Sequence, residues 1–176
     1  MNNIQIGSLL SSCSLTKRHF HGIYASDTLP NNTHTKPSSY ICNLDPSTMS
    51  GSHWVCFYFP LKGLPEYFDS FGFPPTKNFE NFLGYSYIYN PGFIQYPLST
   101  VCGQYCIYYL WQRALNKSMY TILSEFDSEN LLYNDMLVNN AIENHFSVDL
   151  DIFNVDFVSN QLCLSYKQLE NNIYYD

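Results

Sequence analysis

Basic residues are scarce in this sequence. Only 8 Lys and Arg accompany 15 Asp and Glu, which gives a formal net charge of −7, and charged residues make up just 13% of the 176 positions. A surface that binds nucleic-acid phosphates needs clustered Lys and Arg. The one basic cluster, KRHFH at 17–21, is interpreted as a solvated turn. The composition therefore disfavours nucleic acid as a partner, and a hydrophobic content of 45% excludes a disordered chain.

Three other patterns are missing. No C-x-x-C pair occurs among the six cysteines, and Cys102 with Cys106 alone would make a poor ligand set, so we expect no metal. No apolar run approaches the length of a membrane span. The N-terminal MNNIQIGSLLSSC lacks the basic and apolar regions of a secretory signal. We therefore expect a monomer that is not secreted, contacts no membrane and keeps its thiols reduced.

Aromatic side chains, by contrast, are abundant. The 16 Tyr and 13 Phe raise the aromatic content to 18% and supply packing material for a sizeable core. No internal repeat or low-complexity tract divides the chain, and the segment 28–39 (TLPNNTHTKPSS) is predicted to be a surface loop. The length favours a single domain that spans residues 1–176.

Strand-forming residues dominate the first half of the chain. β-Branched and aromatic residues predict strands at 53–59 (HWVCFYF) and 66–72 (EYFDSFG), and the intervening PLKGLP predicts that they form a hairpin. A strand is also predicted at 40–47, entering a turn at its Asp-Pro pair, and another at 85–90 (YSYIYN). Residues 20–30 suggest a short strand or turn.

Helical patterns follow in the second half. Residues 102–115 (CGQYCIYYLWQRAL) predict a mostly buried helix, and 128–146 predict an amphipathic one with Ser128 as its cap. The apolar stripe of the second helix would contain Leu131, Met136, Val138 and Ile142. The sum is an α+β fold in which an antiparallel-centred sheet packs against helices.

Two polar residues stand at the same predicted sheet edge. His53 opens the first hairpin strand and Asp69 nearly closes the second, so antiparallel pairing can make them neighbours. A carboxylate beside an imidazole accepts a hydrogen bond from one ring nitrogen, fixes the tautomer and favours the imidazolium. The second nitrogen then needs a partner of its own.

Cys102 is the candidate partner. Ser99 and Thr100 ahead of it are predicted caps, which would place the thiol at a helix N-terminus, where amides and the helix dipole favour the thiolate. Gly103 removes a side chain where a substrate backbone would approach. The Cys102 amide could stabilise an oxyanion, with the side chain of Gln95 as a second donor.

Each of these residues also has an ordinary structural interpretation. A strand histidine can be a surface or core residue, a cysteine on an apolar helix usually serves packing, and the aspartate and glutamine could simply end a strand or belong to a loop. Catalysis is favoured by their joint order, in which every member lies at an element boundary. That order is His53, Asp69, Gln95 and Cys102.

These residues resemble the adenain-type cysteine proteases of adenoviruses and related DNA viruses. The resemblance rests on SHWV, on YFDSFGF and on a glutamine seven residues before CG, and it covers residues 20 to about 146. Flanking stretches, FHGIYASDTLP and FDSENLLYNDMLV, are similar to protease genes of adenovirus-like and Maverick-type elements. These proteases share a fold with the ubiquitin-like-protein proteases that remove SUMO.

The resemblance implies a papain-like or adenain-like cysteine proteinase fold, with the nucleophile at the start of a buried central helix. It implies that Cys102 is the nucleophile, His53 the general base, Asp69 its orienting acid and Gln95 an oxyanion-hole donor. It also implies that Trp54 roofs a narrow channel that admits only small residues, with cleavage after Gly. Packing of Trp54 in the core is the alternative interpretation.

Two features depart from the family. Adenain is basic and uses DNA as a cofactor, whereas this chain carries −7. Adenain is also activated by a viral peptide that is disulfide-linked to a cysteine upstream of the nucleophile, whereas no cysteine lies between Cys56 and Cys102. The residues themselves indicate no required cofactor, and DNA or an activating peptide is implied by the resemblance alone.

The sequence therefore predicts a viral cysteine endopeptidase that cleaves virion precursor proteins during maturation. It would act in the nucleus or cytoplasm of the host cell and in the virion. Within the enzyme class, the alternative is a deubiquitinase or deSUMOylase that acts on host conjugates. The competing class is a non-catalytic binding module that retains the fold, for which loss of the Cys102 thiol would change no function.

Overall fold

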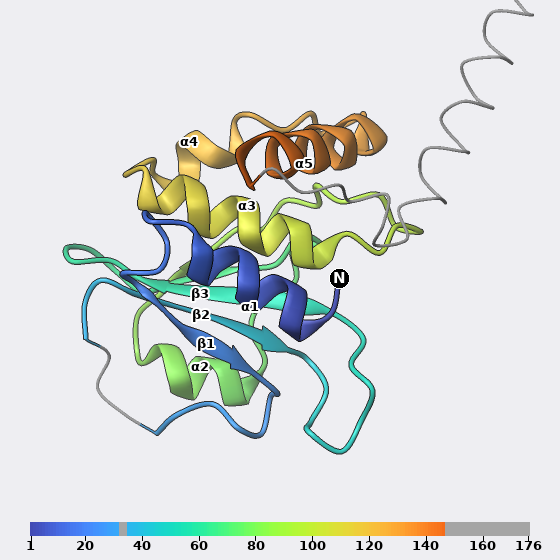
Figure 1. Ribbon diagram of the computed structural model, residues 1–176. Coiled ribbons are helices and arrows are strands. Elements are labelled where there is room, and N and C mark those ends of the chain that lie inside the picture. The colour runs from blue at the N-terminus through green and yellow to red at the C-terminus, as the bar shows by residue number, and fades with distance from the viewer. Residues whose placement is uncertain (32–34, 147–176) are drawn as a thin grey trace, which may run out of the picture.

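A five-stranded sheet forms the middle layer of the protein (Figure 1). The computed structural model describes residues 1–31 and 35–146. Within them the strands follow the spatial order β1-β2-β3-β4-β5, which is also their order along the chain. Their bounds are β1 (Phe20–Tyr24), β2 (Ser38–Asn43), β3 (Trp54–Phe59), β4 (Glu66–Phe68) and β5 (Ile88–Tyr89).

The centre of the sheet is antiparallel and its edges are parallel. β3 pairs antiparallel with both β2 and β4, while β1 and β5 each run parallel to their neighbour. This confirms the predicted antiparallel-centred sheet and the β3–β4 hairpin. In that hairpin Cys56 lies opposite Phe68, so the residues just before β3 and just after β4 meet at one edge.

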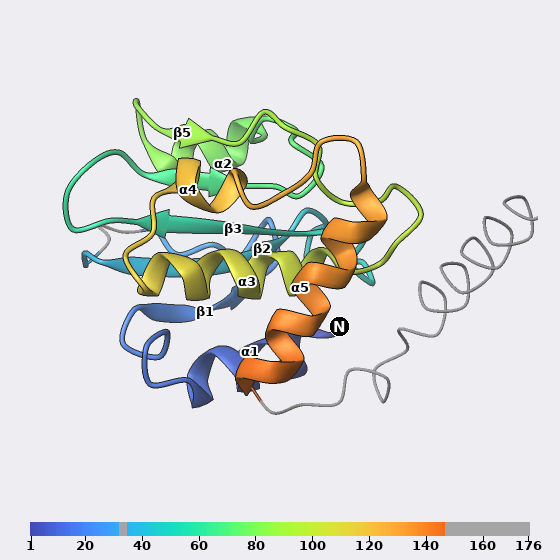
Figure 2. The same cartoon turned by 90° about the horizontal axis from the view of Figure 1, so that it is seen from above.

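Helices cover both faces of the sheet (Figures 1 and 2). One face carries α1 (Asn3–Ser12) and α3 (Cys102–Ala114), with α4 (Met119–Leu123) and α5 (Leu131–Phe146) packed beyond α3. The other face carries α2 (Lys77–Leu83), whose Phe79 and Leu83 pack on Phe57 and Tyr67. Because both faces are covered, β3 is an almost continuous apolar run instead of an alternating one.

The buried central helix is confirmed. Every residue of α3 from Cys102 to Leu110 is buried, because the sheet lies beneath the helix and α1 and α5 flank it. A helix that is apolar around most of its circumference can only be stable in such an enclosed position. Its first residue, Cys102, is thereby held at the sheet edge where the β3–β4 hairpin ends.

Two details predicted for α5 are wrong. Ser128 does not cap this helix: α5 begins at Leu131, and the side chain of Asn130 accepts a 3.1 Å hydrogen bond from the amide of Tyr133. Met136 is not in the buried stripe either, because its side chain is 37% exposed. The buried face instead includes three polar residues beside the apolar ones: Asn134, Asp135, Val138, Asn139 and Ile142.

Other differences concern element bounds. Helices α1, α2 and α4 were not predicted, β5 is only two residues long, and β2 starts at Ser38, inside the segment predicted as a loop. Residues 32–34 of that loop, and residues 147–176 with Cys163, lie outside the described residues, so the prediction of one domain over 1–176 stays a prediction. Among the described helices, none has the length and apolar character needed to traverse a bilayer.

Candidate active site

The β3–β4 hairpin joins the predicted histidine and aspartate. His53 immediately precedes β3 and Asp69 immediately follows β4, and His53 Nε2 lies 2.7 Å from Asp69 Oδ1. Both side chains are shielded from solvent, with Asp69 1% and His53 7% exposed. The same carboxylate oxygen accepts a 2.8 Å hydrogen bond from the amide of Phe71, which fixes its direction. The structure therefore places a buried acid–imidazole pair at this edge.

Asn90 secures the position of this aspartate. Its side-chain oxygen accepts a 2.9 Å hydrogen bond from the Asp69 amide, and its Nδ2 donates to the Asp69 carbonyl at 2.6 Å. Asn90 is completely buried just beyond β5, so it ties the end of β4 to the end of the neighbouring strand. Sequence analysis missed Asn90, because an asparagine after a strand is an ordinary turn residue.

Cys102 lies on the other side of the imidazole. Its thiol and the His53 side chain border the same pocket, and each shifts the pKa of the other. Because Asp69 occupies Nε2, Nδ1 is the ring nitrogen left for the sulfur. Cys102 is the first residue of α3 and is 8% exposed, so the sulfur is nearly enclosed. The predicted trio of cysteine, histidine and aspartate is assembled in that spatial order.

Electrostatics favour a charged pair at this site. Burial opposes the imidazolium, yet the hydrogen bonds and charges of Asp69 and Cys102 outweigh it and raise the pKa of His53 to about 9. Burial also opposes the thiolate, but the hydrogen bond and charge of His53, with a main-chain hydrogen bond from Trp54, lower the pKa of Cys102. A thiolate beside an imidazolium is the activated form of a cysteine nucleophile.

The predicted caps of α3 are wrong. Val101 occupies the N-cap position and makes no side-chain capping bond. Ser99, one of the two predicted caps, instead donates its hydroxyl to the carbonyl of Tyr96 at 3.0 Å. The first amides of α3 therefore have no side-chain acceptor, and this is the arrangement in which main-chain N–H groups can serve a developing oxyanion.

Gln95 is the fourth predicted residue, and it borders the same pocket as His53 and Cys102. Its Oε1 accepts a 2.6 Å hydrogen bond from the Ser70 hydroxyl, and its Nε2 donates to the carbonyl of Ser99 at 3.0 Å. The same Nε2 also donates to the Ser99 hydroxyl at 3.1 Å, so both acceptors belong to one residue, and donation to a ligand requires one of these two bonds to open. The side chain is held rigidly, with no exposed surface.

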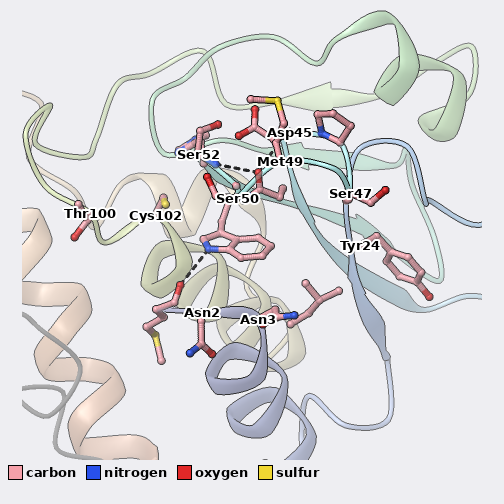
Figure 3. A pocket seen from close by; sticks show the side chains of 18 of the residues that line it. Asn2, Asn3, Tyr24, Asp45, Ser47, Met49, Ser50, Ser52, Thr100 and Cys102 are labelled. Atoms are coloured by element: carbon pink, nitrogen blue, oxygen red, sulfur yellow. Dashed lines mark hydrogen bonds between the residues drawn. The ribbon is translucent and has the colours of Figure 1, made fainter.

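A pocket of about 600 Å³ extends away from Cys102 (Figure 3). Figure 3 shows Cys102 and Thr100 at one end, Tyr24 toward the other, and two walls between them. The β2–β3 loop forms one wall and the first three residues of the chain form the other. The labelled wall residues are Asp45, Ser47, Met49, Ser50 and Ser52 on the loop, and Asn2 and Asn3 opposite.

The loop wall is supported from its base by Asn43. The Asn43 side-chain oxygen accepts hydrogen bonds from the amides of Asp45 (3.0 Å) and Ser52 (3.2 Å) and so closes the loop. Gly51 permits this closure. Its φ is +89°, and a Cβ there would lie 2.8 Å from the side-chain amide nitrogen of Asn43. The wall is thus a supported turn and not a free loop.

Trp54 and Gly103, the two predicted substrate-binding residues, lie in different surroundings. Trp54 borders the pocket and donates from Nε1 to the carbonyl of Met1 at 3.2 Å, and its role as a channel roof stays a prediction. Gly103 does not border the pocket. A Cβ at Gly103 would lie 3.0 Å from Ile6 Cδ1 and 3.3 Å from Trp54 Cδ1, so the glycine makes room for α1 and not for a substrate.

An aromatic stack that sequence analysis missed covers the imidazole. The ring of Phe71 lies on that of His53, with centroids 4.8 Å apart, and Phe93 stacks on Phe71 at 5.2 Å. The FDSFG motif carries Phe71, but nothing in the sequence indicates which face of the ring meets the histidine. Within the described residues no group of three or more His, Cys, Asp or Glu gathers as a metal site.

The arrangement defines a thiol–imidazole–carboxylate site at the edge of an α+β fold, and comparison with solved structures identifies that fold. The chain is similar to a crystal structure of the ASFV pS273R protease, with a TM-score of 0.52 and 17% sequence identity. The match covers 76% of this chain and 64% of that one. The protein therefore has the fold of this protease, over less than two thirds of the protease's length.

A selenomethionine crystal structure of the same protease is also similar, with a TM-score of 0.43 and 22% identity over 58% of this chain and 44% of that one. No protein-family model and no curated protein matches the sequence.

Proposed function

We propose that the protein is a viral cysteine endopeptidase of the adenain type. The observation that carries the proposal is the buried Cys102–His53–Asp69 alignment, in which one imidazole bridges a thiol and a carboxylate. The similarity of fold to the ASFV pS273R protease supports it. A cysteine that only packs a helix would not need a histidine whose pKa is raised to about 9 beside it.

In the proposed reaction the Cys102 sulfur attacks the carbonyl carbon of the scissile bond, and the carbonyl oxygen becomes an oxyanion. The amide of Cys102 and the side chain of Gln95 donate hydrogen bonds to it. Collapse of this intermediate breaks the C–N bond, and His53 gives its proton to the leaving amine. Water, deprotonated by His53, then attacks the thioester, and the C–S bond breaks to release the acid and the thiol.

The proposed substrates are virion precursor proteins cut after small residues such as Gly, in the host nucleus or cytoplasm and in the virion. Trp54 borders the pocket beside Cys102, and the proposed preference for small side chains assigns to it the role of a channel roof. We propose that the chain acts as a monomer without a metal, and that it needs no DNA because its net charge is −7.

Thiol reactivity is the first test of the site. The purified protein is treated with iodoacetamide at about pH 6, and the modified cysteines are mapped by mass spectrometry. We expect fast labelling at Cys102 that is lost in His53→Ala and in denaturant, because an ordinary thiol with a pKa near ~8.5 is almost entirely protonated there. The matched control is Cys13, a partly exposed thiol whose sulfur lies 3.6 Å from His145 Nε2, an imidazole whose pKa burial lowers instead of raising. Equal, slow labelling of Cys13 and Cys102 would refute an activated pair.

Substrate choice is tested on a panel of peptides with Gly before the cleaved bond and of ubiquitin-like fusions, using wild type and Cys102→Ala. Cleavage of peptides by wild type alone supports the endopeptidase. Robust cleavage of fusions alone would replace it with a deconjugating enzyme. If wild type and Cys102→Ala behave alike in every assay, the non-catalytic binding module is the correct interpretation.

A further inference from the structure

The segment that carries Gln95 is held from the sheet side by Ser70. The main-chain carbonyl of Ser70 accepts hydrogen bonds from the amides of Ile94 (3.0 Å) and Gln95 (3.2 Å). The Ser70 hydroxyl also donates to the Gln95 side chain at 2.6 Å. Because Ser70 directly follows Asp69, the oxyanion donor and the acid that orients His53 share one anchor.

The opposite side of the same segment is held by two neighbouring residues of α5. Asn134 donates from Nδ2 to the carbonyl of Ile94 at 3.0 Å. Asp135 accepts through Oδ1 a 3.3 Å hydrogen bond from the amide of Tyr96. The residues on either side of Gln95 are therefore both bound to α5, although about forty positions separate them in sequence.

The aspartate is also connected to the nucleophile's own helix. The hydroxyl of Tyr105, in the first turn of α3, donates to Asp135 Oδ1 at 2.8 Å and lies 3.0 Å from the Ile94 carbonyl. The hydroxyl of Ser99, which accepts from the Gln95 side chain at 3.1 Å, donates to the carbonyl of Tyr96 at 3.0 Å, and the amide of this same Tyr96 is bound to Asp135. One carboxylate thus touches the segment before Cys102 and α3 itself, and through Tyr96 it is linked to Ser99, which receives the Gln95 side chain.

Burial of these two polar side chains costs folding free energy. Neither Asn134 nor Asp135 has any exposed surface. Burial raises the pKa of Asp135, and the hydrogen bonds from Tyr105 and Tyr96 only partly offset that effect. A buried polar pair stabilises a fold less than an apolar pair of similar size. The contribution of these two residues is instead to position residues 94–96, which their hydrogen bonds hold in place.

We propose that Asp135, assisted by Asn134, is a positioning residue that orients the Gln95 amide for the oxyanion. The proposal rests on the proposed thiol-protease function of the site. Asp135 does not border the pocket and touches no reacting atom; it acts through Tyr96 and Tyr105. Acylation of Cys102 by a substrate should depend on the hydrogen bonds of Asp135. Simple alkylation of the Cys102 sulfur forms no oxyanion and should not depend on them.

A double-mutant cycle tests the proposal. With Asp135→Ala we expect kcat to fall about tenfold or more with little change in KM, because a small misplacement of a catalytic donor is enough. The rate of alkylation of Cys102 by iodoacetamide should stay within about twofold of wild type. In a Gln95→Ala background, Asp135→Ala should cost almost nothing further, since its effect passes through Gln95. Additive losses in the cycle would overturn the proposal.

Two more variants separate positioning from general stability. Asp135→Asn keeps an oxygen for Tyr96 and Tyr105 and should restore most of kcat. Asn139→Ala is the matched control: it lies one turn along the same buried helix face, and among the described residues its side-chain oxygen has no hydrogen-bond partner. It should leave kcat unchanged. A loss in Asn139→Ala as large as in Asp135→Ala would contradict a specific role.

Hydrogen exchange provides a readout that needs no turnover. In Asp135→Ala, and not in Asn139→Ala, the amides of residues 94–99 should exchange faster, while those of β3 should not. If wild type cleaves no substrate but this pattern is seen, the protease proposal fails while the positioning contact is upheld. Unchanged exchange at 94–99 overturns the positioning role whatever the activity.

Discussion

At the scale of single residues, competing electrostatic effects decide the state of the site. Burial alone would hold His53 neutral and Cys102 protonated, and for each group it is the largest single influence. The influences of Asp69 and Cys102 on His53 together exceed it, so the imidazolium persists to about pH 9. The outcome depends on these local groups, among them the Asp69 carboxylate 2.7 Å from His53, and not on the chain's overall charge.

A pH profile tests this balance. The thiolate–imidazolium pair exists above the lowered pKa of Cys102 and below the pKa of His53 of about 9, so kcat/KM should fall as the pH rises through about 9. Asp69→Asn removes a charge and changes a hydrogen bond that both raise the His53 pKa, so the alkaline limb should move down by about one unit or more.

The matched control for this profile is Asp45→Asn. Asp45 borders the same pocket but is not among the groups that shift the His53 pKa, so its loss should leave the alkaline limb in place. An alkaline limb that stays near pH 9 in Asp69→Asn would show that the carboxylate does not set the histidine's protonation.

At the scale of elements, the turn after β4 determines how the site residues meet. Gly72 closes this turn with a φ of +69°, and its amide donates to the Asp69 carbonyl at 2.8 Å. The turn packs directly on the chain that leads to Gln95, since a Cβ at Gly72 would lie 2.7 Å from the main chain of Gly92. The atoms nearest to such a Cβ belong to the main chain of Gly92 and Pro91, so no flexible side chain could move away from it.

We therefore expect Gly72→Ala to lower the free energy of unfolding by about 3 kcal/mol, from left-handed strain together with overpacking. Urea denaturation measures it. Gly92→Ala is the matched control on the other side of the same contact: its Cβ would meet nothing within 4 Å, so the change should stay within about 0.5 kcal/mol. Similar losses in both variants would show that the contact is not tight.

The elements also show where sequence signals suffice. The hairpin and α3 were predicted because their residue patterns are long and strong. Helix α1 was missed although its signal was present: Asn2 and Gln5 form a reciprocal capping box, which is visible as asparagine and glutamine three residues apart. Its apolar positions, Ile6, Leu9 and Leu10, are too few to predict a helix alone.

At the scale of the whole molecule, the pocket lies where distant segments converge. The first residues of the chain, the β2–β3 loop and the start of α3 all border it. The sheet order and the packing of α1 over α3 and β1 bring these segments together (Figure 2). The pocket belongs to the assembled fold and to no single motif.

Charge at this scale predicts how the protein responds to DNA. With a net charge of −7, duplex DNA should neither bind at about 0.1 M salt nor change kcat/KM by more than about twofold. Fluorescence anisotropy and the peptide assay measure the two effects. Strong activation that disappears with added salt would contradict this expectation. The double variant Lys17→Glu, Arg18→Glu would then show whether the basic cluster at 17–21 is responsible.

The sequence by itself determined the parts of the site that depend on local order. His53 and Asp69 could be paired because antiparallel hairpin geometry converts positions along two strands into neighbours, and Cys102 could be placed because an apolar helix follows it. The α+β class followed from the same strand and helix patterns.

Only the tertiary structure decided what surrounds these residues. Asn90 and Asp135 hydrogen-bond to main-chain groups that are far away in sequence. Phe71 stacks on His53, and Gly103 packs against α1, in orientations that the local sequence does not encode. A side chain that bonds to a distant main-chain group follows no strand or helix period. Its partner is defined only when the elements have packed.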